Sequence, residues 1–179
     1  HPGPSYAVDL LNRGLRRGFV GGTDTHSTMA AGYGDEHLDR LSGMSAVYAD
    51  TLDRQAIFDG IRGRNCYAAS GERVYLEGAV AGLGFGQSTR WTDTRRPREL
   101  SLLAAGKSDI VTIDVVRNGQ TVHSVKPGDW HAQVEFADEI DLANVALDSK
   151  YLGTFAYYYF RVTCASGAQA WSSPVWLEL

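Results

Sequence analysis

An Asp-x-His unit is the clearest candidate for chemistry in this chain. Asp24 and His26 lie two positions apart in GFVGGTDTHS, residues 18–27. If this segment is extended, their side chains project to the same face, because side chains alternate along a strand. Carboxylate and neutral imidazole are both ligands of divalent transition metals. The spacing therefore indicates two ligands of a metal site, the alternative being a carboxylate that orients a histidine or caps a turn.

Two ligands are too few for a catalytic ion, which needs at least three protein ligands. His37 lies in GDEHLDR, an acidic stretch that equally fits a solvated turn. Arg73, in CYAASGERV, has a guanidinium that can bind a phosphate bidentately, although pairing with an acid or covering apolar surface is favoured for it. His37 and Arg73 are thus candidate substrate contacts, and we expect the remaining metal ligands outside these 179 residues.

Other kinds of catalytic site find no support in the sequence. Ser27 follows His26, but no Gly-x-Ser-x-Gly elbow is present, and the glycines at 18, 21 and 22 lack the order of a dinucleotide-binding loop. Cys66 and Cys164 are far apart and outside any zinc-binding spacing. His123 and His131 are expected to be structural, since neither has a ligand partner at close spacing.

The elements that must position Asp24 and His26 have the order of an α/β protein. We expect a helix over residues 5–18, a short buried strand over 19–24, a second strand over 44–50 and a helix within 51–64 capped by Asp50 or Thr51. The side chains expected to point inward from the last helix are Ala56, Ile57, Phe58 and Ile61. Parallel strands need helices on both faces, so this region is typical of the end of a larger α/β domain. Its glycines permit close backbone approach.

From about Val74 the pattern changes to short alternating runs separated by Gly, Asn, Asp and Pro, which predicts an antiparallel β-sandwich, Ig-like in general architecture. Asn118-Gly119 is a strong hairpin signal. We therefore divide the chain into residues 1–70, the end of an α/β barrel, and residues 71–179, the sandwich.

Period-two alternation also assigns faces to YYYFRV, residues 157–162. The side chains expected in the core are Tyr158, Phe160 and Val162. Those expected to point outward are Tyr157, Tyr159 and Arg161.

Several of these motifs, in this order, resemble a subfamily of the PHP (polymerase and histidinol phosphatase) superfamily. They are RGFVGGTDTHS, then GMSAVYADTLDRQAIFDGIRGRNCYAASGERVYLEGAVAG, and finally YYYFRVTCASGAQAWSSPVWLEL. The resemblance covers essentially the whole chain and implies the C-terminal part of a metal-dependent phosphoesterase with a distorted β/α barrel.

The resemblance also implies roles for the Asp-x-His unit. Asp24 would bind one metal ion and His26 another, in a cluster of zinc, manganese or iron acting on a phosphorylated small molecule. The superfamily's His-x-His motif is absent here, and His1 is not expected to be a ligand. We therefore expect the 179-residue chain to be inactive by itself.

Composition limits the partners. A net charge of −4 and a pI near 5.7 give no basic field for nucleic acid, and no apolar run is long enough to span a membrane. The alternative to a hydrolase is a binding or assembly module that recognises a glycan or protein through exposed aromatic side chains, although core positions are favoured for them. An incomplete barrel would expose apolar edges, so we expect self-association.

Overall fold

The computed structural model describes residues 6–23 and 41–179, and the chain is mostly β. The helices are α1 (Ala7–Asn12), α2 (Arg54–Arg62) and the 3₁₀ turn η2 (Leu142–Asn144). The strands are β1 (Leu41–Val47), β2 (Cys66–Gly71), β3 (Tyr75–Val80), β4 (Ser88–Arg90), β5 (Arg98–Arg117), β6 (Gln120–Val125), β7 (Asp129–Asp138), β8 (Leu147–Ser149), β9 (Gly153–Cys164), β10 (Gln169–Ser172) and β11 (Val175–Glu178).

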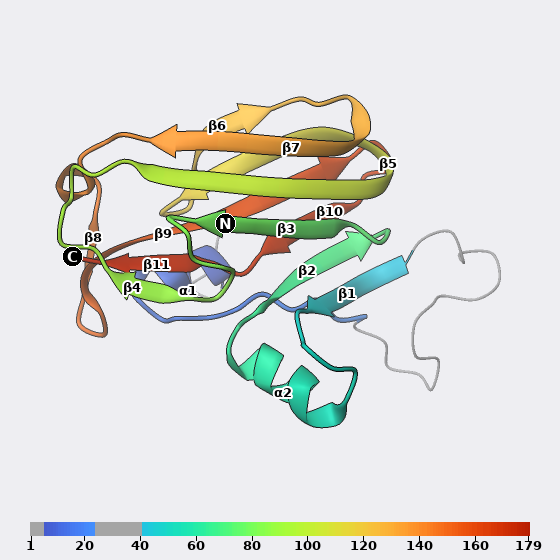
Figure 1. Ribbon diagram of the computed structural model, residues 1–179, viewed down its shortest axis with the longest axis horizontal. Coiled ribbons are helices and arrows are strands. Elements are labelled where there is room, and N and C mark those ends of the chain that lie inside the picture. Colours follow the sequence, from blue (N-terminus) through green and yellow to red (C-terminus); the bar gives the residue numbers. More distant parts are fainter. Residues whose placement is uncertain (1–5, 24–40) are drawn as a thin grey trace.

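These strands form one multi-stranded sheet that is continuous through β5 (Figure 1). The first half of β5 pairs with β3 and β7, and its second half pairs with β6 and β9. Register shifts between Ala105 and Ile110 separate the two halves. From β9 the sheet extends through β10 and β2 to β1 in one direction and through β11 to β4 in the other. One bent strand, β5, thus takes part in both halves of the sheet.

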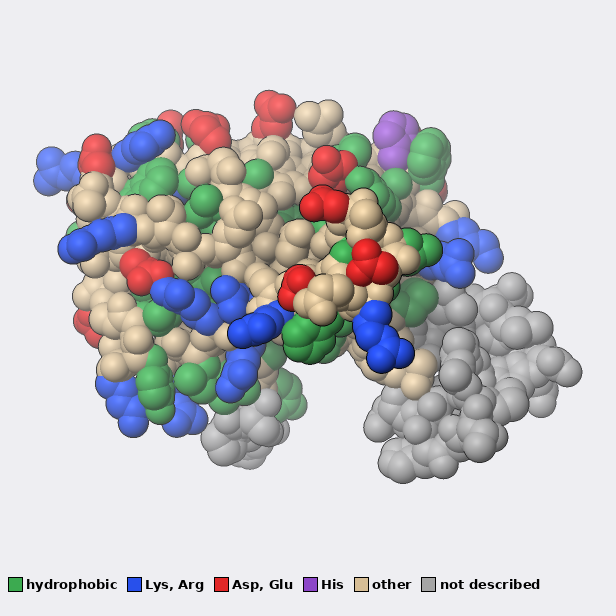
Figure 2. All heavy atoms as spheres, turned by 60° about the horizontal axis from the view of Figure 1, so that its bottom comes forward, with side chains coloured by type: hydrophobic (Ala, Val, Ile, Leu, Met, Phe, Trp, Pro, Cys, Tyr) green, Lys and Arg blue, Asp and Glu red, His purple; other side chains and the backbone are tan. Residues whose placement is uncertain are grey.

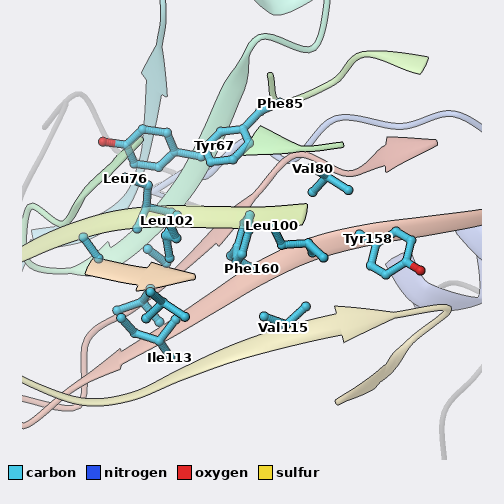
Figure 3. Close-up of a cluster of buried hydrophobic side chains, with 14 of the residues drawn as sticks. Tyr67, Leu76, Val80, Phe85, Leu100, Leu102, Ile113, Val115, Tyr158 and Phe160 are labelled. Carbon is cyan, nitrogen blue, oxygen red and sulfur yellow. The ribbon is translucent and has the colours of Figure 1, made fainter. Parts of the chain in front are cut away.

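The main core lies between the two halves of this sheet (Figure 3). Leu76, Leu102 and Ile113 are fully buried there, and Phe160 and Tyr158 of β9 face them as the alternation predicts. The hairpin at Asn118-Gly119 is confirmed, with positive φ at both residues (51° and 80°) as a tight β5 to β6 turn requires.

The outward assignment of Tyr157 and Tyr159 is wrong. Tyr157 is 0% exposed and Tyr159 is 6% exposed, because a second apolar cluster with Leu11 and Trp176 covers the other face of β9. The Tyr157 hydroxyl donates to Asn12 Oδ1 of α1 at 2.7 Å. β9 is therefore buried on both faces. Alternation of side chains along a strand does not by itself tell whether one face or both faces are buried.

The described residues before β2, 6–23 and 41–65, differ from the α/β expectation. α1 ends at Asn12, and residues 15–23 form neither helix nor strand, with Val20 56% exposed. β1 pairs with β2 in antiparallel register rather than with a parallel neighbour. The described part of the chain contains one parallel pair, β11 with β4.

Helix α2 was also expected to bury a broader face. Its N-cap is Asp53, whose carboxylate accepts from the Ala56 amide at 2.9 Å, rather than Asp50 or Thr51. Phe58 and Ile61 are 56% and 44% exposed, so their inward assignment is wrong. The helix approaches β1 through Gly60, where a Cβ would lie 2.5 Å from Val47 Cγ1, and this contact directs Phe58 and Ile61 away from the sheet.

None of the helices in residues 6–23 and 41–179 has the length and apolar character needed to cross a bilayer. On the face shown in Figure 2, several Lys and Arg side chains gather on the left half, while Asp and Glu are spread more widely.

Candidate functional site

Asp24, His26 and His37 lie outside the residues that the structure describes, so their predicted roles stay predictions. The structure does describe the segment that leads to Asp24, up to Thr23. This anchoring segment, residues 15–23, crosses the second face of the sheet beside β10 and β2. How it is held determines where the Asp-x-His unit begins.

The middle of the anchoring segment is fixed by Phe19. Its amide donates to Ser173 Oγ at 2.9 Å, in the link between β10 and β11. Its ring packs edge-on against Tyr159, with the ring centroids 5.4 Å apart. The Cys66 thiol lies 3.5 Å from the Phe19 carbonyl oxygen. Backbone and side chain are therefore both attached to the sheet.

The end of the anchoring segment is held against β1 by a serine and close backbone packing. The Gly21 amide donates to Ser45 Oγ at 3.1 Å, and the same hydroxyl donates to the Gly21 carbonyl at 2.9 Å. A Cβ on Gly21 would lie 2.3 Å from the Met44 carbonyl oxygen, whereas one on Gly22 would meet nothing within 4 Å. Gly21, but not Gly22, is thus required as glycine for its own packing, as expected for a close backbone approach.

Arg73 lines a different feature, a cavity of about 540 Å³ between β1, β2, the start of β3 and β5. Its exposed side chain forms no ion pair with any residue in 6–23 or 41–179, so an acidic partner for Arg73 stays a prediction. Lys107 lines the same cavity and is also exposed and without such a pair. The apolar lining residues are Met44, Ala46, Tyr67, Ala69, Val74 and Ala105.

The cavity and the anchoring segment both lie against β1. Met44, Ser45 and Ala46 of β1 all line the cavity, and the Ser45 hydroxyl also binds Gly21, so β1 borders both features. Among the described residues, those that line the cavity include Arg73 but none of the anchoring segment. β1 is thus the element that the cavity shares with the segment preceding Asp24.

Glu72 is a buried acid that sequence reasoning missed. Its side chain is 6% exposed and accepts hydrogen bonds from the Lys107 amide (3.0 Å), the Ser108 amide and hydroxyl, and the Ser166 hydroxyl (2.8 Å). Burial raises its pKa, but these hydrogen bonds outweigh burial and hold the pKa below the ordinary value. Because Ser108 and Ser166 are 36 and 94 positions away, no local pattern reveals this cluster.

A second buried charge cluster surrounds Asp138, which accepts from Arg117 at 2.5 Å and from the Tyr158 hydroxyl at 2.8 Å. Arg98, 0% exposed, lies 3.2 Å from the same carboxylate and donates to the Ile140 carbonyl at 2.7 Å. Burial raises the pKa of Asp138, but the hydrogen bonds and the Arg117 charge outweigh burial and hold the pKa below its usual range. With every charge paired between strands, this cluster has a structural role.

The described histidines and cysteines do not form a metal or nucleophile site. Within residues 6–23 and 41–179 no three His, Cys, Asp or Glu side chains gather as a metal site would require. His123 stacks on Phe136 at 4.4 Å. Burial and the neighbouring Glu72 raise the pKa of Cys164 to about 11, so its thiol stays protonated at neutral pH.

Comparisons with known proteins give relatives without an assigned activity. Residues 31–95 match the family described as "Protein of unknown function (DUF3604)", a range that includes Arg73 and four strands, β1 to β4. The chain is 32% identical to an uncharacterized protein of Chlamydia muridarum and 31% identical to one of Chlamydia trachomatis. In both cases the match covers 96% of this chain, which spans 28% of the relative's length.

Among solved structures, the chain is similar to a crystal structure of an engineered protein, at 14% identity and a TM-score of 0.33. That match covers 60% of this chain and 20% of the engineered one. A similarity at this level carries no argument about fold or function.

Proposed function

We propose that this chain is the part of a PHP-type metal-dependent phosphoesterase that carries the last metal-binding motif, with Asp24 and His26 as ligands of different ions. The observation that supports this best is the anchoring segment. The Phe19 amide is hydrogen-bonded to Ser173, and the Gly21 backbone is hydrogen-bonded to Ser45. Two residues separate Gly21 from Asp24, where the motif begins. A metal ligand needs such a fixed origin, because coordination tolerates little displacement.

The donor set of the Asp-x-His unit fits the ions that the resemblance implies. A carboxylate and an imidazole suit zinc, manganese or iron. Bound ions would lower the pKa of a water molecule and orient the phosphate oxygens. Asp24 and His26 supply two ligands, and the remaining ligands would come from a longer protein. This chain spans 28% of the length of its Chlamydia muridarum relative. The 179-residue chain alone should bind metal weakly and show no turnover.

In this proposal the region from residue 71 onward is an antiparallel β-sandwich of Ig-like general architecture, built around the bent strand β5. Its role is to support the metal-binding segment. Tyr159 and Ser173, which hold Phe19, both belong to it. The region also pairs with the preceding one directly, since β10 lies beside β2. Under this proposal residues 1–70 remain the end of the barrel domain.

Arg73 and His37 remain candidate substrate contacts. For Arg73 the structure supplies an exposed guanidinium without an acidic partner in the described chain, at a cavity that shares β1 with the anchoring segment. A role at the metal site would therefore require the Asp-x-His unit to lie beside this cavity.

The alternative of a glycan-binding module is less well supported. Tyr157 and Tyr159, the tyrosines expected to point outward, are buried. Trp176 is 0% exposed and Trp91 is 8% exposed. Trp130, at 56% exposure and beside His131, is the large exposed aromatic on β7 that a binding module would use.

The deciding experiment uses the longer parent protein. Asp24→Ala and His26→Ala should each lower the number of bound metal ions and abolish phosphomonoesterase or phosphodiesterase turnover, measured by elemental analysis and by phosphate release. The matched controls are Asp50→Ala and His131→Ala, which remove the same residue types from exposed positions. Unchanged metal content in both Asp24 and His26 variants would exclude the assignment.

A further inference from the structure

We propose that the cavity lined by Arg73 and Lys107 binds a phosphate monoester carried on an apolar or aromatic group. The two cations bind the phosphate, and the apolar wall receives the organic group. The cavity volume of about 540 Å³ is in the range of small-molecule sites. Its lining residues come from β1, β2, the start of β3 and the bend of β5, and these parts of the strands lie toward the right of Figure 1.

Arg73 and Lys107 line the same cavity because Glu72 joins the turn after β2 to the bend of β5. Arg73 follows Glu72 in the chain, and the Lys107 amide donates to the Glu72 carboxylate at 3.0 Å. The same carboxylate binds Ser108 and Ser166, which fixes the bend of β5 against the turn between β2 and β3. A buried acid thus places two exposed cations at one cavity without pairing with either side chain.

The cavity has two cationic lining residues and no acidic one in the described part of the chain. None of the residues that line it is Asp or Glu, and neither cation pairs with an acid in the described residues. Tyr75 at the edge donates its hydroxyl to Glu77 at 2.6 Å, so this carboxylate is engaged outside the lining. Two exposed cations that pair with no acid in the described residues favour an anionic ligand, and an arginine fork suits phosphate oxygens.

The apolar wall selects for an organic phosphate over inorganic phosphate. Tyr67 and Ala69 are nearly buried, while Met44 and Ala46 are partly buried beside them. A bare phosphate would leave this surface in water, whereas an aromatic group would cover it, at about 25 cal/mol for each Å² buried. A neutral aromatic compound would in turn leave both cations without a counter-charge.

This inference is independent of the proposed metal chemistry, because it concerns binding without hydrolysis. The experiment measures phenyl phosphate binding to the 179-residue chain by isothermal titration calorimetry in the presence of EDTA. A failure there leaves the metal assignment intact, and a failure of the metal assignment leaves this cavity intact.

We expect one saturable site that binds phenyl phosphate at least tenfold more tightly than inorganic phosphate or phenol. Arg73→Gln and Lys107→Gln should each weaken binding about tenfold, and the double variant about a hundredfold if the two contacts add. Both side chains are exposed, so the variants should fold. Lys126→Gln, at an exposed lysine outside the cavity, is the matched control and should bind as the original chain does.

Three results would overturn the proposal. They are no binding at millimolar phenyl phosphate, an equal loss of affinity in Lys126→Gln, and equal affinity for inorganic and phenyl phosphate. Tighter binding of benzoate than of phenyl phosphate would also reject the dianion as the preferred ligand.

Discussion

The sheet from residue 66 onward and the chain before it are stabilised in different ways. In the sheet, each strand has at least one neighbour joined to it by a backbone ladder, and β9 is buried on both faces. Before residue 66, the described residues contain one strand in that ladder, β1. The rest is attached by single contacts such as Phe19 to Ser173 and Gly21 to Ser45. A ladder distributes stability over many residues, whereas single contacts concentrate it at a few.

The largest expected effect is at the buried ions of the sheet. Asp138→Ala should cost about 3–5 kcal/mol in the free energy of unfolding, because it leaves Arg98 buried without its partner. Urea denaturation measures this. The control is Arg95→Ala, which removes an ion pair whose arginine side chain is 86% exposed and should cost less than about 1 kcal/mol. Equal losses would contradict the distinction between buried and surface pairs.

The side chains on the two faces of β9 should contribute similarly to the free energy of unfolding. Phe160→Ala in the main core and Tyr157→Ala in the second cluster should each cost about 3–5 kcal/mol, since both side chains are nearly inaccessible. Tyr151→Ala, at a tyrosine that is 52% exposed, should cost less than about 1 kcal/mol. A small loss for Tyr157→Ala would restore the one-sided interpretation of β9.

Glu72 should make the stability of the junction depend on pH. Its pKa is lower in the folded chain than in the unfolded one, so its stabilisation is complete above the unfolded value, about 4.3, and is lost as the pH falls through the folded value. Glu72→Gln should cost about 1–3 kcal/mol at pH 7. It should also reduce the loss of stability on acidification below pH ~4.3. Glu99→Gln, at an exposed side chain, should cost less than about 0.5 kcal/mol at pH 7.

Substitution of the two neighbouring glycines, Gly21 and Gly22, should affect the anchoring segment differently. Gly21→Ala places a Cβ against the Met44 backbone and should cost about 1–3 kcal/mol locally. Hydrogen exchange at the Phe19 and Gly21 amides would report this, because both donate to serine hydroxyls of the sheet. Gly22→Ala, where the Cβ meets open space, should leave these amides protected. Equal exchange in both variants would mean that the segment is not held by close packing.

The smallest effect on stability is expected on α2. Leu52→Ser and Phe58→Ser change side chains that are 95% and 56% exposed, so the free energy of unfolding should change by less than about 0.5 kcal/mol. Self-association, if it uses this apolar surface, should decrease, as measured by sedimentation velocity. Trp130→Ser on β7 is the matched control at another exposed apolar side chain. Equal association in all variants would place the contact elsewhere.

The sequence-based predictions were more accurate for the sheet from residue 66 onward than for the chain before it. Strands β3, β6 and β7 and the Asn118-Gly119 hairpin follow from alternation and turn chemistry, which are local. The expected strand is not formed over its described residues, 19–23, and Phe58 does not point inward, because both predictions depended on neighbours that the local pattern does not specify. The Asp-x-His unit lies outside the described residues, so its role still depends on the spacing and the resemblance.

The sequence by itself determined that the second part of the chain is β, where its turns fall, and which two residues are the best candidates for metal ligands. Only the tertiary structure decided that Tyr157 is buried, that Glu72 joins three loops, and that Arg73 and Lys107 share a cavity. The physical reason is the sequence separation over which each kind of interaction acts. Alternation and turn geometry act over a few residues, whereas burial and hydrogen bonding of buried charges depend on partners up to 94 positions away.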